Sequence, residues 1–171
     1  MTLSSDAVVH ELLDDRGVRD RLVERWGAEV TTDGTVDRGR VGAIVFDSPE
    51  ELAWLESVLH PLVGERVAAW RGAIGSDVPL AVVEVPLLFE TAMEDAFDST
   101  VAVVADDETR ASRAGLRGTD LLEARSERQL PQAEKAARAD QVITNDGSLE
   151  DLDRRVAEVM ELLSGPSRAR R

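Results

Sequence analysis

The 171-residue sequence contains no cysteine, which excludes disulfides and thiolate metal sites. Lysine is almost absent as well, because Lys135 is the only lysine among the 20 Lys and Arg residues. No apolar run is long enough to span a membrane. The N-terminus is acidic and lacks a long apolar stretch, so no signal peptide is expected. These absences predict a cytoplasmic protein. Any mechanism that needs a lysine to bind a phosphate has to use Lys135.

The charge is strongly unbalanced, with a formal net charge of −14. Such a charge argues against nucleic-acid binding through a surface that neutralises phosphates. The hydrophobic fraction of 43% is ordinary for a globular protein, and the length suits one domain. With no repeat and no linker, the sequence predicts a single domain over residues 1–165 and a disordered tail over residues 166–171. It predicts no membrane partner and gives no oligomeric state.

The first half of the chain has the apolar spacing of helices. "DAVVHELL" predicts a helix with Asp6 as its N-cap, and "GVRDRLVERWG" predicts a second that ends at Gly27. A turn at Asp33-Gly34 is followed by a predicted helix that runs to Phe46. Ser48 is expected to cap a long helix, which Pro61 should kink or split.

The pattern changes to continuous apolar runs in the second half. "PLAVVEVPLLF", "DSTVAVVADD" and "ADQVITNDG" read as strands buried on both faces, the kind found in parallel sheets. The short run "TLSS" before Asp6 is β-like, and Ser148 is expected to cap a closing helix. Strands alternating with helices predict an α/β fold with an open parallel sheet and a helical insertion over about residues 16–75.

Ligands of open parallel sheets bind beyond the carboxyl ends of the strands. Asp6 follows the first predicted strand, and Glu90 follows the "AVVEV" run. The third strand is followed by arginines at helical spacing, among them Arg113 and Arg117. The fourth leads into Asn145 and a polar loop. The strand ends therefore offer carboxylates, an arginine cluster and an amide.

The residues alone leave alternatives open. Guanidinium groups match phosphate oxygens, but the arginines equally suit a solvated face neutralised by the acidic residues around them. Asp6 and Glu90 suit helix capping as well as chemistry. His60, before Pro61, suits a packed residue at a helix kink, and Arg38 an ordinary surface position.

Several segments, in this order along the chain, together resemble dephospho-coenzyme A kinase: "VFDSPEELAWLESVLHPLV", "VEVPLLFE", "RASRAGLRG" and "SERQLPQAEKAARADQVITNDGSLEDL". The resemblance extends from Thr2 to about Leu163. It implies a P-loop kinase-like parallel sheet flanked by helices, a helical acceptor-binding insertion, and an arginine-bearing lid over about residues 108–138. The implied reaction is ATP-dependent phosphorylation of the ribose 3′-hydroxyl of dephospho-coenzyme A, with Mg²⁺, in the last step of coenzyme A biosynthesis.

The resemblance also implies roles for particular residues. Asp6 matches the carboxylate that activates the acceptor hydroxyl, with Ser4 in place of the family's first acidic residue. Arg38 and His60 match the acceptor-binding side, where Glu90 is also expected to bind substrate. In the resemblance, the arginines that contact the transferring phosphates are Arg113 and Arg117. The residue near the adenine is Asn145.

One family motif is absent from the sequence, the phosphate loop G-x-x-x-x-G-K-[ST]. Ala136 follows the only lysine, so no disguised copy exists. We expect the first strand, this loop and the first helix to be missing, about 30 residues by the size of a βαβ unit. The chain alone is therefore expected to be inactive.

Three explanations of this absence compete. The gene start lies at an internal Met, or the chain is a truncated homologue that binds coenzyme-A-like ligands without catalysis. The third is an interaction module that uses an exposed sheet edge.

Overall fold

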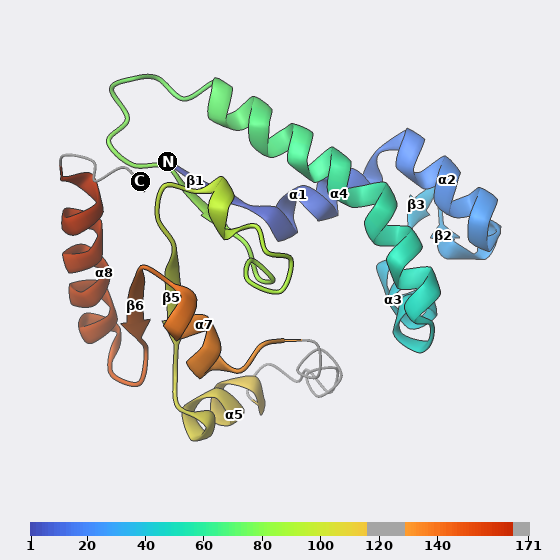
Figure 1. Ribbon diagram of the computed structural model, residues 1–171. Coiled ribbons are helices and arrows are strands. Elements are labelled where there is room, and N and C mark those ends of the chain that lie inside the picture. Colours follow the sequence, from blue (N-terminus) through green and yellow to red (C-terminus); the bar gives the residue numbers. More distant parts are fainter. Residues whose placement is uncertain (116–128, 166–171) are drawn as a thin grey trace. The chain divides into compact units, whose positions relative to one another are not determined.

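The computed structural model describes residues 1–115 and 129–165 (Figure 1). The chain divides into two compact units, Met1–Pro86 and Leu87–Arg171, referred to below as unit 1 and unit 2. The single domain over residues 1–165 stays a prediction. Among the described residues, no helix has the length and apolar character needed to cross a membrane.

Unit 1 is mainly helical. Its elements in chain order are β1 (Thr2–Ser4), α1 (Ser5–Asp14), α2 (Arg16–Trp26), η1 (Ala28–Val30), β2 (Thr31–Thr32), β3 (Thr35–Val36), α3 (Arg38–Asp47), α4 (Pro49–Gly72) and β4 (Val82–Glu84). β1 and β4 pair in parallel, with Leu3 opposite Val83. β2 and β3 form an antiparallel hairpin, so the predicted helical insertion also contains a small β element.

Local sequence signals account for several of these boundaries. Asp33 and Gly34 have φ values of 52° and 78°, which confirms the predicted turn, since tight hairpins favour positive φ at both central residues. The side chain of Asp37 caps α3 by accepting from the amides of Gly39 and Arg40. Ser48 caps α4 by accepting from the amide of Glu51, as predicted.

The structure corrects the prediction for Asp6 and decides between the two effects, a kink or a split, predicted for Pro61. Asp6 is not the N-cap of α1, because β1 runs directly into the helix and Ser4 occupies the cap position. Asp6 is the second residue of α1, and its side chain is exposed. Pro61 does not split α4, which continues through it and changes direction midway in Figure 1. A proline lacks the N–H of an interior helical bond, which accounts for a bend at this point.

The core of unit 1 forms where α1 and α3 pack against α4. Its buried members are all aliphatic: Val8, Leu12, Leu13, Val18, Leu22, Val30, Val36, Val41, Leu55 and Leu59. Leu22 and Val30 are completely buried. This core fixes α1, the helix that carries Asp6, against the long helix that carries His60.

Unit 2 contains a second parallel pair. Its elements are η2 (Glu94–Ala96), β5 (Val101–Val104), α5 (Asp107–Gly115), α7 (Gln132–Arg138), β6 (Gln141–Thr144) and α8 (Leu149–Ser164). Ala102 of β5 lies opposite Val142 of β6. α7 packs beside β5 and α8 beside β6 (Figure 1). Ser148 caps α8, as predicted, through a reciprocal capping box with Asp151.

The α/β class and the parallel strands are confirmed, but the predicted burial of the strands is wrong. Strand β4 has only three residues, and Val82 within it is 44% exposed. Val103 of β5 is 61% exposed and Val142 of β6 is 43% exposed. Among the described residues each parallel strand pairs with one other strand only, so the sheets are too narrow to bury both faces.

Candidate functional site

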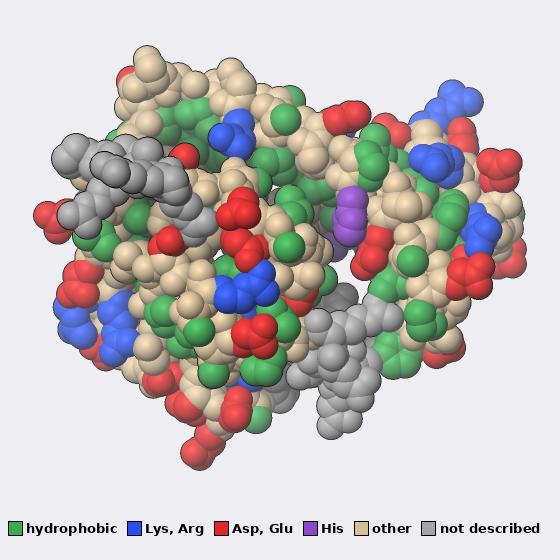
Figure 2. Space-filling model, viewed as in Figure 1, with side chains coloured by type: hydrophobic (Ala, Val, Ile, Leu, Met, Phe, Trp, Pro, Cys, Tyr) green, Lys and Arg blue, Asp and Glu red, His purple; other side chains and the backbone are tan. Residues whose placement is uncertain are grey.

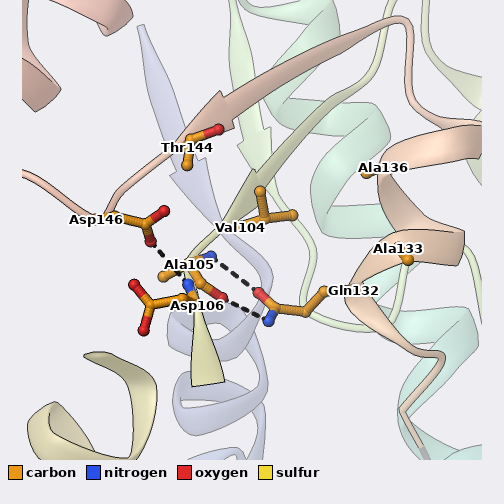
Figure 3. Close-up of a pocket in the computed structure, with 8 residues that line it drawn as sticks. All are labelled: Val104, Ala105, Asp106, Gln132, Ala133, Ala136, Thr144 and Asp146. Atoms are coloured by element: carbon orange, nitrogen blue, oxygen red, sulfur yellow. Dashed lines mark hydrogen bonds between the residues drawn. The ribbon is translucent and has the colours of Figure 1, made fainter. Parts of the chain in front are cut away.

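A cavity of about 260 Å³ lies at the carboxyl ends of β5 and β6 (Figure 3). The residues that line it come from the two strand ends and from α7: Val104, Ala105, Asp106, Gln132, Ala133, Ala136, Thr144 and Asp146. This is the end of a parallel pair at which α/β proteins bind their ligands. We refer to it as the strand-end cavity.

The side chain of Gln132 ties α7 to the end of β5. Its Nε2 donates to the carbonyl oxygen of Ala105 at 2.7 Å, and its Oε1 accepts from the amide of Ala105 at 3.0 Å (Figure 3). The amide group of one side chain thus satisfies both main-chain groups of Ala105. Gln132 is not among the site residues predicted from the sequence, since nothing in the spacing distinguishes it from a surface glutamine.

Two carboxylates organise the loops at the other side of the cavity. Asp146 accepts from the amide of Asp106 at 2.7 Å. Asp106 in turn accepts from the amide and hydroxyl of Thr109, at 2.7 and 2.9 Å, at the start of α5. These bonds from Thr109 hold the pKa of Asp106 below its usual range. Asp106 is therefore a loop-ordering carboxylate that stays ionised.

The structure brings together two of the predicted residues, Arg113 and Asn145. Arg113 donates from Nη1 to the carbonyl oxygen of Asn145 at 2.8 Å, and the amide of Asn145 donates to Val104 at 2.7 Å. The guanidinium is thereby anchored beside the strand-end cavity. Arg110 instead forms an exposed ion pair with Asp107 at 3.1 Å. This pair agrees with the alternative in which the arginines lie on a solvated face and are neutralised by nearby acidic residues.

Arg117, the second predicted phosphate-binding arginine, lies outside the residues that the structure describes. Its predicted role therefore stays a prediction.

Glu90 is held by protein groups in unit 2. Its Oε1 lies 2.8 Å from Nζ of Lys135 and accepts from the amide of Leu130 at 2.9 Å. Burial alone would raise the pKa of Glu90, but the bonds from Lys135 and Leu130 outweigh it and the pKa lies below its usual range. The alternative of a cap on a following helix is wrong, because the next residues form turns.

In unit 1, Arg38 lies against the helix that carries Asp6. Its Nη2 is 3.2 Å from Oδ2 of Asp14 and 3.5 Å from the carbonyl oxygen of His10. Asp6, His10 and Asp14 follow one another at four-residue intervals, so they share one face of α1. All three are exposed. Arg38 thus borders the face from which Asp6 projects.

His60 is exposed on α4, the helix that packs against α1. Because His60 is exposed, the alternative of a packed residue at a helix kink is wrong. Its role toward a ligand stays a prediction.

No group of three or more His, Asp or Glu side chains that could hold a metal occurs within residues 1–115 and 129–165. On the face shown in Figure 2, the Lys and Arg side chains of the described residues lie among acidic ones within each unit.

The chain shares its α/β fold with two solved structures. A crystal structure from Thermus thermophilus matches 96% of this chain and 85% of its own, with a TM-score of 0.78 and 34% identity. A dephospho-CoA kinase from Campylobacter jejuni matches 95% of this chain and 84% of its own, with a TM-score of 0.69. At 21% identity, the second match supports the fold alone.

The family follows from the sequence comparisons. The family model for dephospho-CoA kinase matches residues 2–151. The dephospho-CoA kinase of Brucella melitensis is 38% identical over 166 residues, which cover 95% of this chain and 82% of the relative. The dephospho-CoA kinase of Thermosynechococcus vestitus is 40% identical over 147 residues, which cover 83% of this chain and 71% of the relative. The chain belongs to the dephospho-CoA kinase family, and so to the kinases of coenzyme A biosynthesis.

Proposed function

We propose that this protein works as a dephospho-CoA kinase, transferring phosphate from ATP to the ribose 3′-hydroxyl of dephospho-coenzyme A. The observation that carries this proposal is the family match over residues 2–151 together with the strand-end cavity beside Arg113 and Asn145. Phosphoryl transfer depends mainly on positioning and on charge neutralisation, which suits a site of anchored side chains.

On the nucleotide side, the strand-end cavity receives the adenine of ATP near Asn145. Arg113 uses one N–H for the carbonyl oxygen of Asn145. A guanidinium has five N–H donors, so others are available for phosphate oxygens. Arg117 would add a second guanidinium from outside the described residues.

On the acceptor side, the carboxylate of Asp6 orients and deprotonates the attacking hydroxyl. Arg38 and His60 bind dephospho-coenzyme A, and the bond to Asp14 holds the guanidinium of Arg38 along α1. These roles rest on the resemblance and on the positions of the three residues in unit 1.

We further propose that the chain as printed has negligible kinase activity by itself. Its sequence contains no phosphate loop, whose amides, lysine and hydroxyl would hold the ATP phosphates and Mg²⁺. The second candidate function is a binding or interaction module without catalysis, which the exposed apolar side chains of the narrow sheets favour. A cytoplasmic location remains the expectation from the sequence.

Calorimetry with dephospho-coenzyme A tests the acceptor side independently of catalysis. The wild-type chain should bind the ligand, and Arg38→Ala should weaken binding roughly tenfold, the usual effect of losing a hydrogen bond to a charged group. Arg16→Ala, which removes an exposed arginine paired with Asp20 on α2, is the matched control and should leave affinity unchanged. Absence of binding to the wild-type chain at millimolar concentration would refute the proposal.

A further inference from the structure

Helix α7 (Gln132–Arg138) has two faces with different contacts. Gln132, Ala133 and Ala136 line the strand-end cavity. Lys135 and Arg138 project from another side of the helix and contact the segment that follows β4. At about 100° per residue, the centres of the two faces are about 140° apart around the helix axis. One face of α7 therefore lines the cavity, while Lys135 and Arg138 on the other face attach the helix to the rest of unit 2.

The contact at the back of α7 is centred on Glu90. Its carboxylate receives Nζ of Lys135 at 2.8 Å and the amide of Leu130 at 2.9 Å, on the same oxygen. The side chains of Glu90 and Lys135 are only 11% and 18% exposed. The other oxygen, Oε2, is buried and has no hydrogen-bond partner among the described residues.

A second contact lies one helical turn further along. Arg138 forms an ion pair with Glu94, and its guanidinium carbon lies 5.2 Å from the ring centre of the buried Phe89. Lys135 and Arg138 are three residues apart and so lie on one face of the helix. Both bonds join α7 to the same short segment of unit 2, residues 89–94.

We propose that Glu90 and Lys135 are positioning residues, whose ion pair fixes α7 and thereby holds Gln132 against Ala105 at the strand-end cavity. A charge pair this well shielded from water keeps its geometry, because separating the partners leaves a buried charge uncompensated. The pair therefore acts on the cavity through the helix and not by touching a ligand. This replaces the expectation from the sequence that Glu90 binds substrate.

The inference rests on the proposed function only for the nature of the occupant, an adenine nucleotide. The position of the helix can be measured in the protein without any ligand. If ATP does not bind, the assignment of an adenine nucleotide to the cavity is wrong. The positioning role of Glu90 and Lys135 is then decided by the position of α7, which is measured without a ligand.

Amide hydrogen exchange, followed by NMR on the full chain, reads the position of α7 directly. The amide of Ala105 is bonded to Gln132 and reports the cavity wall, while the amide of Asn145 is bonded to Val104 and reports the strand pair. Glu90→Gln should speed exchange at Ala105 on the order of tenfold, by local opening, and leave Asn145 unchanged. The double variant Glu90→Gln/Lys135→Met should do the same without leaving a lone buried charge.

Two variants serve as controls. Lys135→Arg keeps the positive charge and should retain wild-type protection at Ala105. Glu134→Gln changes an exposed carboxylate on the same helix and should have no effect. Unchanged exchange at Ala105 in both the Glu90→Gln and the double variant would overturn the proposal. Equal acceleration at Ala105 and Asn145 would also overturn it, because the pair would then only stabilise unit 2 as a whole.

Calorimetry separates positioning from direct contact with the acceptor. Glu90→Gln should leave the affinity for dephospho-coenzyme A at its wild-type value. A loss of that affinity with wild-type exchange at Ala105 would show that Glu90 contacts the substrate, and the positioning role would be wrong.

Discussion

The side chain of Glu51 joins α2 to α4 in the unit that carries Asp6, Arg38 and His60. It accepts two bonds from Arg25, at 3.0 and 2.9 Å, and one from the indole N–H of Trp26 at 2.7 Å. Arg25 also lies over the ring of Trp54, which meets Trp26 edge to face at 5.0 Å. One carboxylate thus completes a cluster that the sequence does not predict, because its two halves, residues 25–26 and 51–54, are far apart along the chain.

The pH dependence of this cluster has a definite sign. The bonds from Arg25, and then from Trp26, hold the pKa of Glu51 below the ordinary glutamate value of 4.5. A lowered pKa in the folded state adds stability above that ordinary value, and the stability is lost as the pH falls through the lowered pKa. Glu51→Gln should therefore lower the melting temperature at neutral pH, and the difference from wild type should shrink on acidification below 4.5.

Thermal unfolding followed by circular dichroism measures this difference. Glu50→Gln, a change of the exposed neighbouring carboxylate, is the control and should shift the melting temperature less. A difference for Glu51→Gln that grows at acid pH would contradict the account of this residue.

At the scale of single residues, Arg113 and Asn145 are in contact, as expected for residues that follow strands whose carboxyl ends meet, and their roles stay predictions. The sequence placed Asp6 wrongly at a helix cap, since Ser4 at the end of β1 takes that position. It could not find the Glu90–Lys135 pair, which joins residues 45 apart in the chain. Such pairs depend on tertiary structure and have no local signal.

Among the elements, α8 combines a side-chain cap at its start with packing beside β6. None of its residues from Leu149 to Ser164 is buried, although it packs beside β6. Its start is fixed by the capping box of Ser148 and Asp151, with bonds of 3.0 to 3.2 Å. The cap satisfies main-chain amides that would otherwise lack a partner at the start of the helix.

Ser148→Ala should destabilise α8 by about 1 kcal/mol, the usual cost of losing an N-cap side chain. Urea unfolding measures the free energy, and hydrogen exchange at the amide of Asp151, which donates to the Ser148 hydroxyl, reports the first turn. Ser148→Thr keeps the hydroxyl and should remain close to wild type. An Ala variant with unchanged stability and unchanged exchange at Asp151 would refute the role of the cap.

The difference between local signals and tertiary contacts explains which elements the sequence predicts. The caps at Ser48 and Ser148 and the turn at Asp33-Gly34 are encoded within a few residues, and all three are confirmed. Strand burial depends on what covers each strand, and there the prediction fails at Val82 and Val103. Apolar runs therefore indicate strands reliably but not the width of the sheet that they form.

For the whole molecule, the account combines a family assignment with residues held by two separately described units. Asp6, Arg38 and His60 belong to unit 1, while Arg113, Asn145 and the strand-end cavity belong to unit 2. The family match covers residues 2–151, yet the sequence contains no G-x-x-x-x-G-K-[ST] motif and has a single lysine, which is bonded to Glu90. The lysine that a phosphate would require is thus already engaged within the protein.

The most direct test of this account is the formation of coenzyme A from dephospho-coenzyme A and ATP with Mg²⁺ by the purified 171-residue chain. Mass spectrometry of the product over time distinguishes the two compounds by one phosphoryl group. The account predicts no coenzyme A above the level of a control without protein, although dephospho-coenzyme A binds. Rapid formation of coenzyme A would contradict the claim that these 171 residues are inactive by themselves, and its loss in Asp6→Asn would then support the proposed role of Asp6.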